Sequence, residues 1–345
     1  MKILVLNIGS FTFKWELFDE DLVSLKKGNN DLLDISIEEK LKLALEQIGD
    51  TSEIKSIGHR VVHGGREFVQ TTEIKNENIL NLEKYNPLAP LHNPYNVQGI
   101  KASLKLLTGI PNFAVFDTAF YKDLPEVAKT YALPLKYYND GIQKYGFHGI
   151  SHQYVAEEAA QHTGKAIEEC NLITIHLGGG SSITAIKNGK AIDTSMGFTP
   201  LEGLVMGTRC GDIDAGIILK LIREDGLSID RLDDLLNKES GVKALSGFVD
   251  FRDVLKAREG GDRKAKLAFD VFVYHIKKYI GAYFAILGNI DAIVFTGSIG
   301  SGIETTRNEI VNGLEILKGV PVFAIPSGEN IAIAKEAKRC LANRN

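Results

Sequence analysis

The hydrophobic positions form short runs that are separated by longer segments with helical spacing. β-Branched and aliphatic residues cluster in five runs, at 3–6, 113–116, 172–175, 292–295 and 322–325. Runs of this length and composition predict buried strands. The segment 37–48 has an apolar residue every three or four positions, and Ser36 with Glu39 makes a capping box in front of it. Strands that alternate with helices predict an α/β fold.

The pattern of strand, glycine turn and strand occurs twice, about half a chain apart. Near the start, the first run enters Asn7-Ile8-Gly9-Ser10 and is followed by a second apolar stretch at 11–18. In the middle, the run 172–175 enters His176-Leu177-Gly178-Gly179-Gly180-Ser181-Ser182, and then come 183–186, the turn Asn188-Gly189 and a third strand. This duplication predicts two similar domains that face each other across a cleft and lend backbone N–H groups to one polyphosphate.

We place the first domain at 1–147 and the second at 148–330, and we expect a C-terminal helix at 331–345 to pack back on the first domain.

A third glycine turn, Gly297-Ser298-Ile299-Gly300-Ser301-Gly302, follows the run 292–295 and precedes a helix-like segment, a position that favours anions. Any one such turn can simply close a hairpin, but three turns after buried-looking strands favour phosphate binding. The sequence contains no Gly-x-x-x-x-Gly-Lys-Ser/Thr, no helix-opening Gly-x-Gly-x-x-Gly and no protein-kinase loops. The pattern therefore indicates a phosphate site outside those common classes.

Composition narrows the choice of partners and compartment. The chain has 345 residues, 44% hydrophobic and 24% charged, and its net charge of -4 offers no basic surface for nucleic acid. Three widely spaced cysteines make no disulfide framework and no Cys-x-x-Cys metal site, so a reducing compartment fits. The N-terminus is typical of a strand, not of a signal peptide. The weakly charged stretch 279–290 is shorter than the ~18 residues of a membrane span. We expect a buried helix there and a cytoplasmic protein.

Five polar strings lie outside the predicted helices, where side chains can face a ligand. They are His59-Arg60-Val61-Val62-His63-Gly64-Gly65, Leu88-Ala89-Pro90-Leu91-His92-Asn93-Pro94, Phe116-Asp117-Thr118-Ala119-Phe120, Tyr145-Gly146-Phe147-His148-Gly149-Ile150-Ser151-His152, and 193–214. These strings resemble the signature of acetate kinases, in the sugar kinase, Hsp70 and actin superfamily, over nearly the whole chain. The resemblance implies two actin-like (ribonuclease H-like) domains and a homodimer. It also implies reversible phosphoryl transfer from ATP to acetate, which gives acetyl phosphate and ADP with Mg²⁺ or Mn²⁺.

The residue types suit this reaction. A carboxylate with a pKa of ~4.3 is already a nucleophile at neutral pH, so the remaining difficulty is repulsion between two anions, which arginine relieves. By resemblance, Arg60 and Arg209 flank the acetate and the transferred group, and His148 bonds the equatorial oxygens. Asp117 would orient the arginines or the metal, and Lys14 and His92 would line the anion pocket.

Resemblance also implies the binding residues. Val62, Leu91, Phe147 and Pro200 would form an apolar box for the methyl group, and because one methylene is worth only ~1 to 3 kcal/mol, propionate is a second candidate acceptor. Asn7 and Glu329 would position the metal. The nucleotide would contact His176, Leu177, Gly178, Gly179 and Gly180 with its phosphates, Asp250, Phe251 and Arg252 with its adenosine, and Gly297, Ser298, Ile299, Gly300 and Ser301 with its base and ribose.

The chain departs from the family pattern mainly on the nucleotide side. Phe11, Thr12 and Phe13 replace two serines and a leucine, Gly179 replaces an asparagine, and Ser298, Ser301 and Gly302 alter the third turn. Lys144 stands where the family has arginine, and the segment 314–322 is shorter. We therefore keep another nucleotide or pyrophosphate open as the donor, with ATP as the default.

Two other functions fit parts of the pattern. A hydroxyl-directed kinase would use Asp117 as a base, since a hydroxyl needs deprotonation. A degenerate nucleotide-binding protein would explain the altered glycine turns. Other polar groups have structural interpretations: Asp212-Ile213-Asp214 as a helix cap, and Asp250 with Arg252 as a local ion pair.

Overall fold

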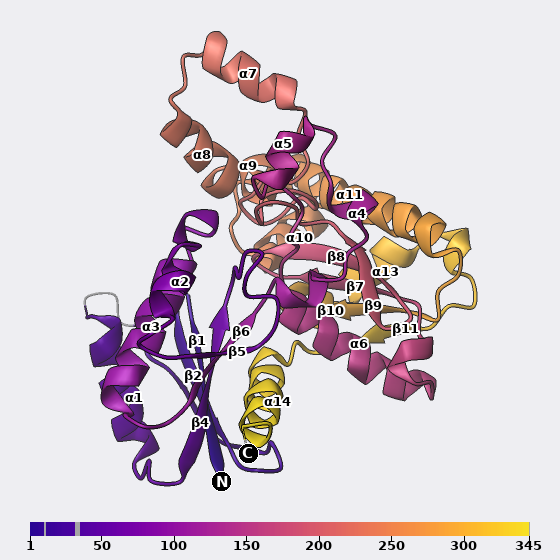
Figure 1. Ribbon diagram of the computed structural model, residues 1–345. Helices are drawn as coiled ribbons and strands as arrows, with labels where there is room; N and C mark the ends of the chain where they lie inside the picture. Colours follow the sequence, from indigo (N-terminus) through magenta and orange to yellow (C-terminus); the bar gives the residue numbers. More distant parts are fainter. Residues whose placement is uncertain (10–11, 32–34, 345) are drawn as a thin grey trace. The chain divides into compact units, whose positions relative to one another are not determined.

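The chain divides into two compact units. The structure is a computed structural model that describes residues 1–9, 12–31 and 35–344 (Figure 1). Unit 1 consists of 1–122, 147–154 and 328–345, and unit 2 consists of 123–146 and 155–327. Helix α6 (Gly149–Thr163) begins in unit 1 and ends in unit 2.

This grouping differs from the boundary expected at residue 147, and hydrogen bonds explain the difference. The segment 123–146 belongs to unit 2, where Tyr145 donates its N–H to the carbonyl of Gly197 at 3.0 Å. Residues 147–154 belong to unit 1, because the Tyr121 hydroxyl donates to the Phe147 carbonyl at 2.9 Å and Gly149 donates to the Asp117 carbonyl at 2.9 Å.

Unit 1 is built around one six-stranded sheet in the order β3-β2-β1-β4-β6-β5. Strand β1 is antiparallel to β2 and parallel to β4, which is parallel to β6. The strands are β1 (Lys2–Ile8), β2 (Phe13–Phe18), β3 (Ser24–Asn29), β4 (Ile54–Val61), β5 (Thr72–Ile74) and β6 (Asn112–Phe116). The predicted strands at 3–6 and 113–116 are confirmed, and the one predicted at 11–18 is observed as β2. Position 11 of that prediction and position 10 of the first glycine turn lie outside the described residues.

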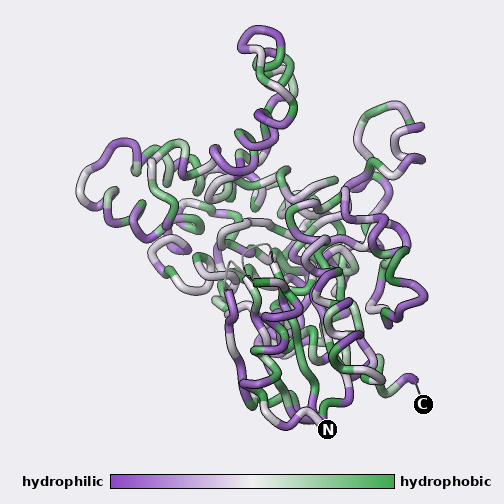
Figure 2. The backbone as a smooth tube through the Cα atoms, turned by 90° about the vertical axis from the view of Figure 1, so that its left-hand side faces the viewer, coloured by the Kyte–Doolittle hydropathy of each residue, from purple (hydrophilic) through white to green (hydrophobic). Residues whose placement is uncertain are grey.

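Helices cover both faces of this sheet. Successive side chains of β1 point to opposite faces, and because they are apolar on both faces, each face has to be covered. Leu4, Leu6 and Ile8 pack with α1 (Ile37–Ile48) and α3 (Asn93–Leu106), whereas Ile3 and Val5 pack with α14 (Glu329–Ala342). Figure 1 shows α1 and α3 on one side of the strands and α14 on the other. Figure 2 shows hydrophobic positions concentrated along these strands. The helix predicted at 331–345 thus packs on unit 1.

Two features at the edges of unit 1 agree with local sequence signals. Ser36 and Glu39 form the predicted capping box in front of α1. The short helix α2 (Ile79–Glu83) adds Ile79 and Leu82 to a separate cluster with β4 and β6.

Unit 2 contains a five-stranded sheet in the order β11-β10-β7-β8-β9. Its strands are β7 (Leu172–Leu177), β8 (Ser181–Lys187), β9 (Lys190–Thr194), β10 (Ala292–Thr296) and β11 (Val322–Ala324). Asn188 and Gly189 both have positive φ, 51° and 75°. Two such residues form the tight two-residue turn that connects the antiparallel strands β8 and β9. The predicted strands at 172–175, 292–295 and 322–325 are confirmed, the last with its end at Ala324.

The long helix α11 (Arg263–Leu287) supplies the core of unit 2. Its side chains Phe269, Phe272 and Ile276 are buried against the side chains of β7 and β8. The helix predicted at 279–290 is the end of α11, which terminates before Gly288, a residue with a φ of 79°. Its predicted burial is only partial, since Ile280, Tyr283 and Leu287 are buried but Ile286 is 51% exposed. The remaining helices are α4 (Glu126–Lys129), α5 (Leu135–Asn139), α7 (Ala215–Arg223), α8 (Ile229–Lys238), α9 (Gly241–Ser246), α10 (Phe251–Glu259), α12 (Gly297–Gly300) and α13 (Glu304–Val311).

The two sheets share one topology. In unit 1 the order β3-β2-β1-β4-β6, and in unit 2 the order β9-β8-β7-β10-β11, begin with two antiparallel pairs and continue with two parallel pairs. Strand β5 is an addition in unit 1, antiparallel to β6. The predicted α/β fold with a duplicated topology is therefore confirmed. Among the helices of the described residues, none is long and apolar enough to cross a membrane.

Candidate active site

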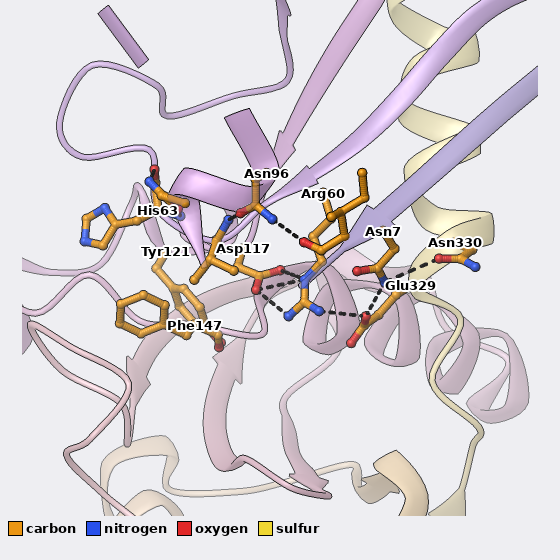
Figure 3. A network of polar contacts seen from close by, with 12 residues as sticks. Asn7, Arg60, His63, Asn96, Asp117, Tyr121, Phe147, Glu329 and Asn330 are labelled. Carbon is orange, nitrogen blue, oxygen red and sulfur yellow. Dashed lines mark hydrogen bonds and ion pairs between the residues drawn. The ribbon is translucent and has the colours of Figure 1, made fainter. Parts of the chain in front are cut away.

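Arg60 lies between two carboxylates at one edge of the unit 1 sheet (Figure 3). Its guanidinium donates to Asp117 through Nε at 3.2 Å and Nη2 at 2.7 Å, and its Nη1 lies 3.3 Å from Glu329 Oε2. Because β4 and β6 are parallel, Arg60 near the end of β4 and Asp117 just after β6 reach the same edge. Glu329, the first residue of α14, completes a cluster with one positive and two negative groups.

Burial and charge oppose each other in this cluster. Burial lowers the pKa of Arg60, but the carboxylates of Asp117 and Glu329 outweigh it and raise that pKa above its usual range. Burial raises the pKa of Asp117, and the guanidinium of Arg60 works against that rise. Arg60 is therefore charged at neutral pH, and the bidentate contact fixes the plane of its guanidinium. Asp117, held on Arg60, is poorly suited to act as a free general base.

Asn7 and Lys14 lie at the same edge. The side-chain amide of Asn7 donates from Nδ2 to Glu329 Oε2 at 3.2 Å and to Asn330 Oδ1 at 3.5 Å (Figure 3). In the register of β1 and β2, Asn7 is directly opposite Lys14, so both side chains leave the same face of the sheet. The structure thus brings five predicted residues, Asn7, Lys14, Arg60, Asp117 and Glu329, to one region of unit 1.

The donor set of this region fits a magnesium ion. Two carboxylates and an amide oxygen are hard oxygen ligands, and Mg²⁺ usually takes only one or two protein carboxylates besides waters and substrate phosphates. In the described part of the chain, no three His, Cys, Asp or Glu side chains gather closely enough to hold a metal by themselves. A metal at this edge would accordingly take the rest of its coordination from oxygen atoms outside the protein, such as those of water.

His148 is held in an unusual backbone conformation. Its φ is +58°, in the left-handed region that non-glycine residues rarely adopt. The neighbours on both sides are fixed, since Tyr121 bonds the Phe147 carbonyl and the Gly149 N–H bonds the Asp117 carbonyl. A Cβ at position 149 would collide with that same carbonyl, so the close approach requires glycine. Such strain persists where the surroundings impose it, and it clusters at functional sites.

The apolar residues predicted in unit 1 surround the loop after β4. Phe147 and Val62 are buried, with 1% and 6% of their surface exposed, whereas Leu91 is 41% exposed. His63, next to Val62, makes an edge contact with the Phe147 ring at 5.5 Å. His92 is only partly exposed and precedes the first turn of α3. Pro200 belongs to unit 2 and is described there.

Two asparagines of α3 hold that loop, and neither had been assigned a role from the sequence. Asn96 accepts the Val62 N–H at 3.1 Å and donates to the Ile8 carbonyl at 2.5 Å, as Figure 3 shows for the region. Asn93 accepts the His63 N–H at 3.0 Å and returns a bond to the His63 carbonyl at 2.9 Å. The sequence signal that could have identified them is two asparagines in the first turn of a helix that begins at the end of the polar string 88–94.

Arg209 has a very different environment in unit 2. Its Nη1 donates to the Pro200 carbonyl at 3.2 Å and lies 3.7 Å from the Met206 sulfur. Among the residues that the structure describes, no carboxylate forms an ion pair with it. Burial lowers the pKa of Arg209, yet arginine stays charged at neutral pH. Within the described residues, a partly buried cation whose partners are a carbonyl and a sulfur is a candidate site for an anion.

The backbone around Arg209 is fixed by the start of α9. Val242 and Lys243 donate their N–H groups to the carbonyls of Met206 and Gly207, both at 2.9 Å. Gly241 has a φ of 65°, and a Cβ there would collide with the Met206 carbonyl. The loop cannot shift without breaking these bonds.

Two of the predicted glycine turns meet at the carboxyl ends of neighbouring parallel strands in unit 2. His176 on β7 is paired in register with Thr296 on β10. Gly178 lies beside Ser298, because a Cβ at Gly178 would be 3.5 Å from the Ser298 hydroxyl and 3.7 Å from His176 Nε2. Ligands of α/β folds bind at the carboxyl ends of such strands. The segments 176–180 and 297–301 thus form one candidate phosphate site.

Gly297 makes the close packing of this site feasible. Its φ is 79°, and a Cβ would collide with the carbonyl of Leu177 on the neighbouring strand. Ser301 bonds back to the Gly297 carbonyl at 2.8 Å, and Arg307 caps the carbonyls of Gly300 and Ser301 at 3.0 and 2.9 Å. Ile299 packs partly buried against the core.

The residues predicted beside adenosine have local partners. Asp250 caps α10 by accepting the Arg252 N–H at 2.8 Å, and the guanidinium of Arg252 lowers the pKa of Asp250 to about 2. The structural interpretation as a local ion pair is confirmed. Phe251 is 8% exposed and packs its ring against Phe272 at 4.9 Å, so it can offer a nucleotide only its backbone. Asp214, not Asp212, caps α7.

Comparison with known proteins identifies the family of this chain. The sequence model of the acetokinase family matches residues 36–343. The acetate kinase of Dictyoglomus thermophilum is 42% identical over 399 aligned positions that cover the whole of both chains. Because this chain has 345 residues, that relative contains segments that are missing here, in agreement with the predicted shortening.

Solved structures of this family superpose closely. The acetate kinase of Porphyromonas gingivalis has a TM-score of 0.90 at 37% identity, with 99% of each chain covered. A propionate kinase from Francisella tularensis also has a TM-score of 0.90, at 34% identity, with 98% of this chain and 99% of that chain covered.

Proposed function

Since the chain belongs to the acetokinase family and is a kinase that acts on a carboxylate, we propose that it transfers the γ-phosphoryl group of ATP reversibly to acetate. A carboxylate oxygen attacks the γ-phosphorus in line, the bond to the bridging oxygen of ADP breaks, and acetyl phosphate and ADP form. No proton has to be removed, because acetate is already ionised.

The observation that carries this proposal is the environment of Arg209. A guanidinium with no carboxylate partner in the described residues can pair with the acetate and with the transferred phosphoryl oxygens. Loss of one such donor typically costs about 3 to 4 kcal/mol of barrier in comparable sites. Arg60, whose guanidinium plane is fixed by Asp117, would be the second arginine to bind carboxylate or phosphoryl oxygens.

The remaining residues would divide binding between them. Asn7 and Glu329 would hold Mg²⁺, which supplies charge neutralisation at the β- and γ-phosphates when it is bound. His148, Lys14 and His92 would bind phosphoryl or carboxylate oxygens, and Val62, Leu91, Phe147 and Pro200 would enclose the methyl group. The turns 176–180 and 297–301 would hold the nucleotide.

Propionate is the second candidate acceptor. The propionate kinase from Francisella tularensis has a very similar structure, and an apolar box discriminates weakly against one methylene. A hydroxyl acceptor is less favoured, because the carboxylate of Asp117 is occupied by Arg60 and is a poor base in that state.

The test is a panel of donors and acceptors with the purified protein. ATP, GTP and pyrophosphate are each combined with acetate, propionate and butyrate in the presence of Mg²⁺, and acyl phosphate is trapped with hydroxylamine. We expect acetyl hydroxamate with ATP and acetate as the most abundant product. Absence of any hydroxamate across the panel would refute the proposal, and a second donor or acid in first place would correct its substrate.

We also propose a homodimer and assign helix α7 to the contact. No residue of α7 is buried. Its apolar side chains Ile217, Leu219 and Ile222 are 41 to 49% exposed, which is unusual for isoleucine and leucine. A second copy would cover this apolar surface. Sedimentation should show a dimer that Ile217→Glu dissociates, whereas Arg223→Glu at the end of the same helix should have a smaller effect.

A further inference from the structure

Three side chains from two distant segments meet at the turn that carries Pro200. The Tyr131 hydroxyl accepts the Phe198 N–H at 2.8 Å and donates to Oε2 of Glu202. Lys144 Nζ donates to the Thr194 carbonyl at 2.8 Å and lies 3.3 Å from Oε1 of Glu202. These bonds attach both ends of the turn 194–202 to the segment 129–146.

The backbone and the packing of the turn agree with this attachment. The carbonyl of Gly197 accepts N–H groups from Tyr145 at 3.0 Å and Gly146 at 3.3 Å. A Cβ at Gly197 would collide with the Tyr131 hydroxyl and the Glu202 carboxylate. Gly197 is not among the glycines with positive φ, so the need for glycine comes from those two side chains and not from the backbone.

The charges of the three groups favour the network. Burial, followed by the nearby carboxylate of Glu202, raises the pKa of Tyr131 above its usual range, so its hydroxyl remains a donor. The Lys144 side chain is only 13% exposed, and its charge compensates that of Glu202. A hydrogen bond between a charged and a neutral group is stronger than one between neutral groups.

The turn also supports Arg209. The guanidinium of Arg209 donates to the carbonyl of Pro200, which lies between the two anchored residues Phe198 and Glu202. Pro200 is two residues from each anchor, and its ring restricts φ, so few backbone angles separate its carbonyl from either anchor. The position of the Arg209 guanidinium therefore depends on side chains that do not touch it.

We propose that Tyr131, Lys144 and Glu202 are positioning residues that place Pro200 and Arg209, and so set the affinity for the carboxylate acceptor without affecting the nucleotide. This inference rests on the proposed function. Lys144, which stands where the family pattern has arginine, donates to the Thr194 carbonyl and to Glu202.

The main experiment compares Tyr131→Phe with Tyr137→Phe in the full-length protein. The first removes the hydroxyl that bonds Phe198 and Glu202, and the second removes a hydroxyl with no hydrogen-bond partner in the described residues. We expect Tyr131→Phe to raise the KM for acetate about tenfold, since a buried N–H loses its acceptor, with the KM for nucleotide within twofold of wild type. Tyr137→Phe should leave both constants unchanged.

A readout that needs no turnover follows the turn itself. Hydrogen–deuterium exchange should become faster in peptides that cover 196–203 in Tyr131→Phe, and should stay at the wild-type rate there in Tyr137→Phe. Peptides from the α11 core serve as the internal reference, and unchanged exchange in them shows that the variant is folded.

Two further substitutions approach the network from other sides. Lys144→Arg should keep the acetate KM within about twofold of wild type, because arginine retains the charge and the donors, whereas Lys144→Met should raise it. Gly197→Ala should raise it as well, because the added Cβ displaces the Tyr131 hydroxyl and the Glu202 carboxylate.

Turnover by the wild-type protein distinguishes failure of the positioning role from failure of the proposed function. If wild type phosphorylates acetate but Tyr131→Phe keeps both the wild-type acetate KM and the wild-type exchange at 196–203, the inference is wrong and the proposed function stands. Equal rises of the acetate and nucleotide KM would also overturn it, because that is what general loosening produces. If wild type phosphorylates no carboxylate, the proposed function fails and the role in acceptor affinity fails with it.

Discussion

The two candidate catalytic arginines occupy opposite environments. In unit 1, Arg60 is shared between Asp117 and Glu329 and is fixed in a bidentate contact. In unit 2, Arg209 has the Pro200 carbonyl and the Met206 sulfur as its partners. The Arg60 cluster carries a net charge of about -1 and therefore suits a cation, whereas the Arg209 environment is positive and suits an anion.

The difference separates two requirements of phosphoryl transfer to a carboxylate, which are a metal at the phosphates and a counter-charge at the acceptor. Under the proposed function, the acidic cluster around Arg60 would meet the first requirement and Arg209 would meet the second. Substitutions in the two environments should therefore have different effects.

The largest effect is expected for Arg209→Ala. Because Arg209 is a partly buried charge with no carboxylate partner in the described residues, the substitution leaves no complementary charge behind, and the Tm should change little. Activity with acetate should fall by about 10²- to 10³-fold or more. Steady-state kinetics and thermal unfolding measure both, with Arg231→Ala, which breaks an exposed ion pair with Glu239, as the control. Turnover near the wild-type rate would remove the assigned role.

Asp117→Asn should damage both stability and the metal requirement. It removes one of the two carboxylates from the buried guanidinium of Arg60 and should lower the free energy of unfolding by about 3 kcal/mol. The Mg²⁺ concentration at half-maximal rate should rise, since the cluster loses its net negative charge. Asp123→Asn, on the exposed surface, is the matched control. An unchanged Mg²⁺ dependence would contradict the division of charge between the units.

Acid should destabilise unit 1 through two buried histidines. Burial lowers the pKa of His59 and of His63 to about 4, below the value of 6.5 of an exposed histidine. The folded state then binds fewer protons than the unfolded state between pH 6.5 and 4. Their stabilising contribution is thus complete above pH 6.5 and is lost as the pH falls toward 4, by up to about 3 kcal/mol for each histidine.

Denaturant unfolding between pH 8 and 4 checks this expectation. His59→Gln keeps a donor for the Asn112 oxygen, which lies 2.7 Å from the ring nitrogen, and should flatten the loss below pH 6.5. His162→Gln replaces an exposed histidine and should leave the curve as in wild type. Hydrogen–deuterium exchange during acidification locates the loss. If peptides from β4 begin to exchange at no higher pH than peptides from unit 2, unit 1 is not the acid-sensitive part.

The smallest effect is expected for Arg252→Ala. Its ion pair with Asp250 is exposed and contributes little to stability. If Arg252 contacts adenosine, as the resemblance implies, the KM for ATP should rise about two- to fivefold and the KM for acetate should not change. Lys256→Ala, on the same helix α10, is the control. An unchanged KM for ATP would restrict Arg252 to its local pairing with Asp250.

The sequence by itself determined the local features of this protein. The apolar runs marked the strands, Ser36 and Glu39 marked the start of α1, and the repeated glycine turns revealed the duplicated topology. The resemblance also named Arg60, Asp117, Arg209 and Glu329. These signals are readable because periodicity, capping and turns depend on residues close together in the chain.

Only the tertiary structure decided which groups meet. Asp117 is 57 positions from Arg60, and Glu329 reaches Arg60 only because α14 returns to the unit 1 sheet. The absence of a carboxylate partner for Arg209 in the described residues, the left-handed backbone of His148 and the bond from Tyr131 to Glu202 had no sequence pattern. Each depends on strand register and on packing between distant segments, which local periodicity does not encode.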